Sequence, residues 1–178
     1  MKKWQDDKRW SDRFLTEIKG ILGTHLIAEP PVEEDAERNT DLMVLKMDSV
    51  RVACRVRKHY YYKTYPCEFT IRAGRNSVHK IELDKIIEGW GDYMLYGFCD
   101  EKESRLQAWA LCDLDVFRRW YVQTLQSLPQ NQSPGMLKEN PDGSSWFRVY
   151  RYDDLPKDFI VATGCIDEAD HAEIRRAS

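Results

Sequence analysis

The sequence lacks the patterns that would assign a function at first sight. Its five cysteines include no C-x-x-C pair, and its four histidines do not cluster with them, which argues against a zinc site. It has no signal peptide and no run of about 18 apolar residues, so we expect a cytoplasmic protein with no membrane partner. The segment Gly89–Asp92 lacks the context of a phosphate loop, and we expect it to end a helix and form a turn.

An excess of charge of one sign is also missing, because the net charge is only -3. The overall charge therefore does not require a nucleic-acid partner. Its distribution is nevertheless uneven: residues 51–75 hold seven Lys or Arg against one acid, and residues 29–48 hold seven acids against two bases. Such neighbouring segments are either solvated faces or a metal site beside a phosphate-binding surface, and both interpretations stay open.

A chain of 178 residues, 42% of them hydrophobic, is expected to form a single domain over residues 1–178. The spacing of apolar residues predicts helices and strands in mixed order. In chain order we expect a helix at 9–22, strands at 41–46 and 50–57 joined as a hairpin, a strand at 67–72, a helix at 78–88, strands at 93–98 and 105–111, a helix capped by Asp113 or Asp115, and a strand at 145–152. This order predicts an α/β (α+β) fold, in which helices flank a central mixed β-sheet.

Three further segments carry their own expectations. Residues 129–143 are predicted to be a polar loop, and residues 167–178 a flexible tail. The Tyr-rich segment 59–65 is either an edge strand with half-buried tyrosines or a surface on which bases stack. Cys54, Cys99 and Cys112 lie in apolar runs and are expected to be reduced core residues.

The predicted hairpin places an acid and two bases on neighbouring strands. Asp41 opens the first strand, and Arg55 and Arg57 share one face of the second. Metal-assisted cleavage of a phosphodiester needs two or three carboxylates around Mg²⁺ and a cation near the phosphate. Glu17 and Glu82 can each add an oxygen to such a site. The two arginines suit a phosphate through their fork geometry and cannot bind a metal ion.

In this order of residues the chain resembles the restriction-endonuclease-like, or PD-(D/E)XK, superfamily. Its pattern is a helix carrying Glu, a strand opening with Asp, a strand with Glu-x-Lys, and a helix. Glu17, Asp41 and Arg55-Val56-Arg57 occupy these places in order. The likeness covers roughly residues 9–112, and we expect a restriction-endonuclease-like core over about 9–128. Arg55 and Arg57 depart from the pattern, since they replace the second acid and the lysine.

Some superfamily members move the missing acid to the following helix, and Glu82, with Lys85 one turn later, is placed for this move. The resemblance then implies a Mg²⁺-dependent endonuclease. Its catalytic residues are Asp41, Arg57, Glu82 and Lys85, and its metal ligands are Asp41, Glu82 and Glu17. Without Glu82 the site has too few oxygens, and the protein is a non-catalytic relative. The nucleic-acid-binding residues would be Arg55, Arg57, Lys58, Lys63, Arg72 and Arg75.

Plainer interpretations of the same residues stay open. Asp41 can cap its strand or pair with an arginine, Glu17 can be solvated, and Glu82 with Lys85 can be a surface pair. Two functions therefore remain. The first is nucleic-acid cleavage or binding, on DNA or RNA, by a divergent nuclease (hydrolase) domain. The second is a small non-enzymatic interaction protein, such as a phage or mobile-element protein that binds a host protein. Six tryptophans and nine tyrosines suit such an interface. The oligomeric state is not indicated.

Overall fold

The computed structural model describes residues 2–28, 43–44, 50–75 and 80–165. The chain divides into two compact units, residues 1–50 and 51–178, which are described separately. Within the described ranges, no helix combines the length and the apolar character that a membrane crossing requires. The predicted tail, residues 167–178, lies outside the described ranges.

The described residues of the first unit form two helices where the sequence predicted one. Helix α1 spans Lys2–Asp12 and helix α2 spans Leu15–Leu26. Near the break, the hydroxyl of Ser11 donates to the carbonyl of Lys8, and the Arg13 side chain donates to the carbonyl of Trp10. These side chains compete for backbone acceptors of the last turn, which favours the end of a helix.

The predicted hairpin of strands 41–46 and 50–57 is wrong in its pairing. Strand β2 (Met43–Val44) pairs with β1 (Ile27–Ala28), and β3 (Val52–Arg57) pairs in parallel with β5 (Tyr93–Cys99). The reason lies in β5, which is buried over almost its whole length. A strand of this kind needs a partner on each side, and β3 supplies one of them.

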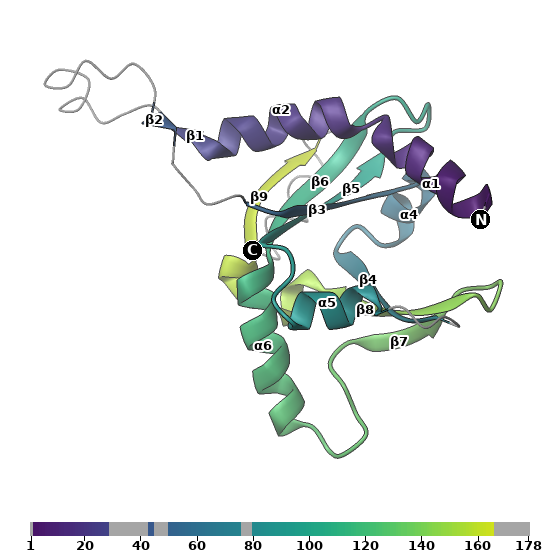
Figure 1. The fold of residues 1–178 in the computed structure, drawn as a ribbon, viewed down its shortest axis with the longest axis vertical. Coiled ribbons are helices and arrows are strands. Elements are labelled where there is room, and N and C mark those ends of the chain that lie inside the picture. The colour runs from purple at the N-terminus through teal and green to yellow at the C-terminus, as the bar shows by residue number, and fades with distance from the viewer. Residues whose placement is uncertain (1, 29–42, 45–49, 76–79, 166–178) are drawn as a thin grey trace, which may run out of the picture. The chain divides into compact units, whose positions relative to one another are not determined.

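The second unit is built on a mixed sheet of order β3-β5-β6-β9 (Figure 1). Strand β6 spans Leu106–Asp113 and β9 spans Ile160–Cys165, and both run antiparallel to their neighbours. Helices flank this sheet, so the predicted mixed α/β class is confirmed. The restriction-endonuclease-like core stays a prediction.

A second, antiparallel sheet has the order β4-β8-β7, with β4 at Glu68–Arg75, β8 at Ser145–Arg151 and β7 at Met136–Glu139. The prediction that residues 129–143 form a loop is therefore wrong for residues 136–139, which form strand β7. This strand has only four residues, three of them exposed. It lacks the alternation of apolar and polar residues by which a strand is recognised.

The described part of this unit also contains three helices: α4 at His59–Thr64, α5 at Glu82–Ile87 and α6 at Leu114–Ser127. Segment 59–65 was expected to be either an edge strand or a surface on which bases stack. Residues 59–64 form the helix α4, so the prediction of a strand is wrong. Helix α5 is shorter than the predicted helix at 78–88. The turn at Gly89–Asp92 is confirmed, since Gly89 and Gly91 have φ of 94° and 82°. Two 3-10 turns follow β8, at Tyr152–Asp154 and Lys157–Phe159.

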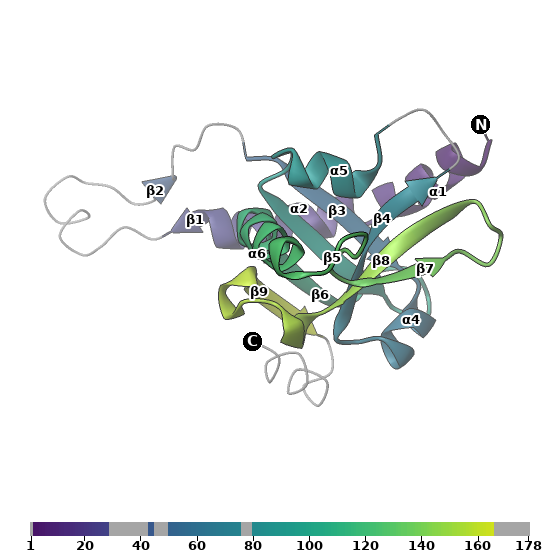
Figure 2. The ribbon, with the colours of Figure 1, turned by 90° about the horizontal axis from the view of Figure 1, so that it is seen from below.

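An aromatic core joins the small sheet to α6, which lies beside it in Figure 2. The Phe69 ring of β4 lies 5.8 Å from the ring of Phe117 on α6 and 5.2 Å from that of Tyr150 on β8. Three more rings lie within 6.2 Å of Phe69, those of Tyr96, Tyr152 and Phe159. Of the three cysteines expected in the core, Cys99 and Cys112 are buried but Cys54 is exposed. The core is thus centred on one phenylalanine.

Asp113 caps α6, as one of the two predicted alternatives. Its side chain accepts hydrogen bonds from the backbone N–H of Asp115 at 2.7 Å and of Val116 at 3.1 Å. We therefore predict that Asp113→Ala lowers the free energy of unfolding by about 1 kcal/mol, the usual cost of losing a cap. Urea unfolding followed by circular dichroism measures the change. Asp158→Ala, at an exposed position outside any such cap, is the control. Equal stability of both variants would contradict the capping role.

Candidate functional site

Two arginines of β3 reach the same residue of β4. Nη1 of Arg55 donates to the Thr70 carbonyl at 2.7 Å and to its Oγ1 at 3.3 Å. Nη1 of Arg57 donates to the same Oγ1 at 2.9 Å. Alternate residues of a strand lie on one face, which explains why both guanidinium groups meet Thr70. Because β3 and β4 belong to different sheets, the arginines bridge the two sheets of the second unit.

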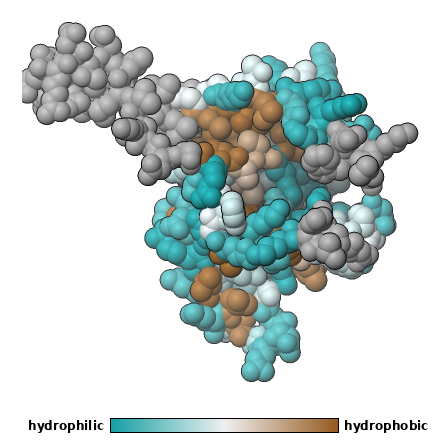
Figure 3. Space-filling model, viewed as in Figure 1, coloured by the Kyte–Doolittle hydropathy of each residue, from teal (hydrophilic) through white to brown (hydrophobic). Residues whose placement is uncertain are grey.

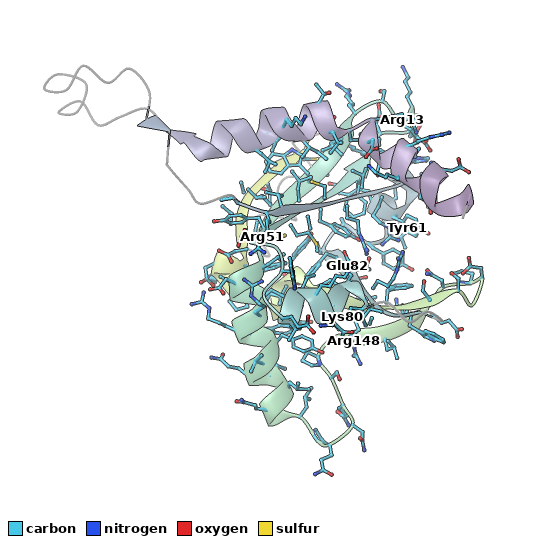
Figure 4. The ribbon with its side chains drawn as sticks, viewed as in Figure 1. Arg13, Arg51, Tyr61, Lys80, Glu82 and Arg148 are labelled. Carbon is cyan, nitrogen blue, oxygen red and sulfur yellow. The ribbon has the colours of Figure 1, made fainter. Side chains whose placement is uncertain are left out.

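Arg55 is neutralised by a carboxylate. Its Nη2 forms an ion pair with Glu82 of α5, and the side chains are 23% and 29% exposed. The same Glu82 oxygen accepts the backbone N–H of Arg72 at 3.0 Å. Figure 4 labels Glu82 on its helix. The carboxylate that sequence analysis assigned to the missing acid thus lies at the end of the Arg55 side chain. It also has two donors in the described chain.

Arg57 has a different environment. Its Nη1 also donates to the hydroxyl of Tyr96 at 3.0 Å, and its guanidinium carbon lies 4.0 Å from the ring centroid of Tyr61 on α4. The hydroxyls of Thr70 and Tyr96 are themselves 3.2 Å apart. Within the described ranges Arg57 forms no ion pair with a carboxylate. Hydroxyls and a ring face therefore hold this cation in place without cancelling its charge.

Arg57 lines a cavity of about 200 Å³ in the second unit. Most of the cavity wall is aromatic or aliphatic, contributed by Tyr61, Tyr65, Tyr96, Phe98, Pro141, Phe147 and Val149. The polar lining residues besides Arg57 are Glu68, Thr70, Lys138, Glu139 and Asn140. A pocket with mainly apolar walls and a few polar groups is typical of a binding site for an organic ligand.

Sequence analysis missed several residues of this cavity. Thr70 carried a weak signal, since it is a polar residue within the apolar strand segment CEFTIR. Nothing in the sequence indicated a role for Lys138, Glu139 and Asn140, because they lie in a segment whose composition is typical of a loop. Their position depends on the pairing of β7 with β8, in which Lys138 lies opposite Phe147.

The other predicted nucleic-acid-binding residues are mostly paired or exposed. Lys58 forms an ion pair with Glu103, and Lys63 forms one with Glu101 at 2.9 Å. Arg72 is exposed, and the side chain of Arg75 lies outside the description. Each nearby carboxylate reduces the attraction of a lysine for phosphate. Of the described candidates, Arg57 is the one that lines a cavity and has no described carboxylate in an ion pair.

The predicted catalytic and metal-binding set is only partly described. Asp41 lies outside the described ranges, and Glu17 is a partly exposed residue of α2 in the first unit. Lys85 is exposed on α5, three residues after Glu82. Within the described ranges, no three His, Cys, Asp or Glu side chains form a group that could hold a metal ion. Mg²⁺ binding by Asp41, Glu82 and Glu17 stays a prediction.

Exposed apolar side chains form a second surface feature. Val122 and Leu125 of α6 are each 41% exposed, and Figure 3 shows brown surface over the lower part of this helix. Met136 and Leu137 of β7 are 63% and 53% exposed. Exposed apolar side chains of this kind are relevant to the alternative function, which is binding to a protein partner.

The loop between β5 and β6 positions the acids that pair with Lys58 and Lys63. Asp100 closes this loop by accepting from the backbone N–H of Ser104 at 2.7 Å and from its hydroxyl at 2.8 Å. The backbone N–H of Ser104 is the main cause that holds the pKa of Asp100 below its ordinary value. A hydrogen bond from Lys63 likewise lowers the pKa of Glu101.

The lowered pKa of Asp100 sets a pH dependence. A carboxylate whose pKa is lower in the folded state stabilises that state above its unfolded pKa, about 3.9, and the stabilisation is lost as the pH falls through the folded pKa. We predict that Asp100→Asn is less stable than the wild type at neutral pH and that the difference shrinks below about pH 4. Urea unfolding across this range measures it, with Asp158→Asn as control. A difference that stays constant at all pH values would contradict the assignment.

Comparisons with known proteins do not assign this chain to a family. No protein-family model, no curated protein and no solved structure matches the chain. The resemblance to the restriction-endonuclease-like superfamily therefore rests on the residues quoted from the sequence alone, and it stays a prediction.

Proposed function

We propose that the second unit binds nucleic acid, with Arg57 on a phosphate and the aromatic walls of its cavity against a base. One observation carries this proposal. Arg57 lies in an aromatic cavity without a described carboxylate partner, whereas Arg55, Lys58 and Lys63 each have one.

The hydrogen bonds of Arg57 support a phosphate ligand. Those formed with described residues all come from Nη1. The N–H groups of Nε and Nη2 therefore remain for a ligand, and a guanidinium binds phosphate through two parallel N–H···O bonds. The ring of Tyr61 holds the guanidinium plane from one side. This orientation is present before any ligand binds, so the ligand does not have to create it.

The charges around the cavity favour a nucleotide over a bare phosphate. Arg57 and Lys138 offer donors, whereas Glu68 and Glu139 offer acceptors. A free phosphate would meet the two cations but also the two carboxylates. A nucleotide presents phosphate oxygens to the cations, and its base edge carries N–H donors that a carboxylate accepts. Stacking on an aromatic side chain adds about 1–3 kcal/mol per base.

Metal-dependent cleavage is a second proposal, supported by the position of Glu82. Its carboxylate contacts Arg55, the residue that replaces the second acid in the superfamily pattern. An acid supplied from the following helix would lie in this place. In a cleaving enzyme Glu82 and Asp41 would be the residues that hold Mg²⁺, and the carboxylate of Glu82 would then have to be released from Arg55.

The alternative of a small interaction protein uses another surface. Val122 and Leu125 on α6 offer exposed apolar side chains to a protein partner. Loss of binding on changing Arg57 separates the two accounts, because a partner on α6 does not require the cavity.

Substitutions of Arg57 test the binding proposal. We predict that Arg57→Ala weakens the affinity for a short labelled single-stranded oligonucleotide by roughly tenfold or more, since a hydrogen bond to a charged group contributes about 1.5–3 kcal/mol. The slope of log affinity against log salt concentration should become shallower by about 0.7, the value for one phosphate contact on a single strand. Arg57→Lys keeps the charge but loses the fork, and should cost about 1 kcal/mol. Fluorescence anisotropy at several salt concentrations measures these values.

Two further variants keep this experiment interpretable. Arg105→Ala removes an exposed arginine of the β5–β6 loop and serves as the charge-matched control. Tyr61→Leu keeps Arg57 but removes the ring beside it, and should also weaken binding. Urea unfolding shows whether each variant is folded. If Arg57→Ala and Arg105→Ala bind equally well, the cavity does not bind nucleic acid.

The cleavage proposal predicts metal-dependent products. With Mg²⁺ or Mn²⁺, Asp41→Ala and Glu82→Ala should each abolish cleavage of labelled DNA or RNA, because both carboxylates are needed to hold the ion. Arg57→Lys, which restores the usual superfamily residue, should preserve or increase it. Gel electrophoresis of the products with and without EDTA measures cleavage. Cleavage that survives both alanine substitutions would remove the metal role of these residues.

A further inference from the structure

A second cavity, of about 480 Å³, lies in the same unit beside α6 and β7. Its apolar lining includes Trp120 in the middle of α6, Leu128 directly after this helix, Met136 of β7 and Tyr150 of β8. Glu68, Lys138 and Val149 line both this cavity and the one that contains Arg57. Because three residues are common to both, the two cavities are neighbours on the sheet β4-β8-β7.

The rim of the second cavity is held by an arginine. Nη1 of Arg148 donates to three successive carbonyls, those of Ser133 at 3.0 Å, Pro134 at 3.1 Å and Gly135 at 2.8 Å. Gly135 has φ of 79°, and a Cβ there would lie 2.6 Å from the ring of Tyr150. A larger residue would therefore be both strained and obstructed, which fixes how the chain passes this wall.

Tyr150, which lines the second cavity, carries a buried hydroxyl. The hydroxyl of Tyr150 is buried, with the residue 2% exposed, and has no hydrogen-bond partner in the described chain. Burial raises the pKa of Tyr150, so the hydroxyl stays a neutral donor. Buried hydroxyls normally have a partner.

We infer that the ligand is single-stranded nucleic acid, of which one nucleotide enters the Arg57 cavity and the next enters the Trp120 cavity, with Lys138 between them. This inference rests on the proposed function. Lys138 lines both cavities, and its ammonium lies 5.4 Å from the ring centroid of Tyr65, with no described carboxylate in ion-pair distance. Alternating cations and aromatic rings are how proteins follow a single strand.

The narrowness of the first cavity excludes a paired base. At about 200 Å³ it is smaller than the usual pocket for a drug-sized ligand, so it accommodates one ring system rather than a base pair. A base that enters it must be unstacked and unpaired, which costs least in a single strand. A duplex can offer only its phosphates to Arg57 and Lys138.

Ligand length and strandedness test this inference. The probes are thymidine monophosphate, the di- and tetranucleotides of thymidine, and a duplex that contains the tetranucleotide, measured by isothermal titration calorimetry on the full chain. We expect the dinucleotide to bind about tenfold tighter than the monophosphate, with little further gain for the tetranucleotide and weaker binding of the duplex. Trp120→Phe should reduce the affinity for the dinucleotide but leave that for the monophosphate within about twofold, because Trp120 lines only the second cavity. Lys138→Met should reduce the affinity for both ligands, because Lys138 lines both cavities. Lys157→Met, at an exposed position outside both cavities, is the control.

The possible results distinguish a failure of the two-cavity inference from a failure of the proposed function on which it rests. If the duplex binds as tightly as the tetranucleotide, and Trp120→Phe and Lys138→Met leave dinucleotide affinity unchanged, the two-cavity path is wrong. Sensitivity of the monophosphate to Arg57→Ala would then still support the first cavity. If Arg57→Ala changes none of the affinities, the proposed function fails as well. Trp120→Phe keeps an aromatic ring beside Phe117 and Tyr150, so folding is preserved and the result decides the question.

Discussion

The alternation of side chains along β4 determines both the core and the candidate site. Phe69 faces five aromatic rings of the core, and the next residue, Thr70, receives both arginines of β3 on the opposite face. A shift of β4 by one residue would exchange these faces, placing the phenylalanine against the two arginines and the hydroxyl in the aromatic core. The antiparallel pairing of Phe69 with Tyr150 and of Thr70 with Val149 fixes the strand against such a shift.

Charge compensation then decides which arginine of β3 is available to a ligand. Arg55 and Arg57 are chemically identical and two residues apart, but only Arg55 contacts a carboxylate, that of Glu82. An ion pair at this depth gains Coulomb energy and loses hydration, so its main effect is to fix the geometry of α5 against β3. Arg57 is fixed by neutral hydroxyls and a ring, which orient a cation without reducing its charge. One arginine serves the fold and the other faces the cavity.

Sequence analysis predicted the positions of helices and strands better than it predicted which strands pair with one another. The buried run of β5 and the cap at Asp113 could be recognised, because each is a local signal of burial or of backbone hydrogen bonding. The partner of β3 could not, since the turn residues 48–49 favoured a local hairpin over a strand some forty residues away. Arg55 and Arg57 both contact Thr70, and Glu82 pairs with Arg55, so the structure brings these three residues together. The cavity itself was not predictable, because it needs Lys138 and Asn140 from a segment whose composition is that of a loop.

The clamp of Arg148 on Ser133, Pro134 and Gly135 has a consequence for the speed of recognition. A rim that is ordered before contact does not have to close over an arriving molecule, so no conformational step delays association. Encounter is then governed by diffusion and by the local field of the cations, and selection between molecules occurs in how long each one stays. Under the proposed binding function, such a surface would discriminate between ligands through their dissociation rates rather than through a closing motion.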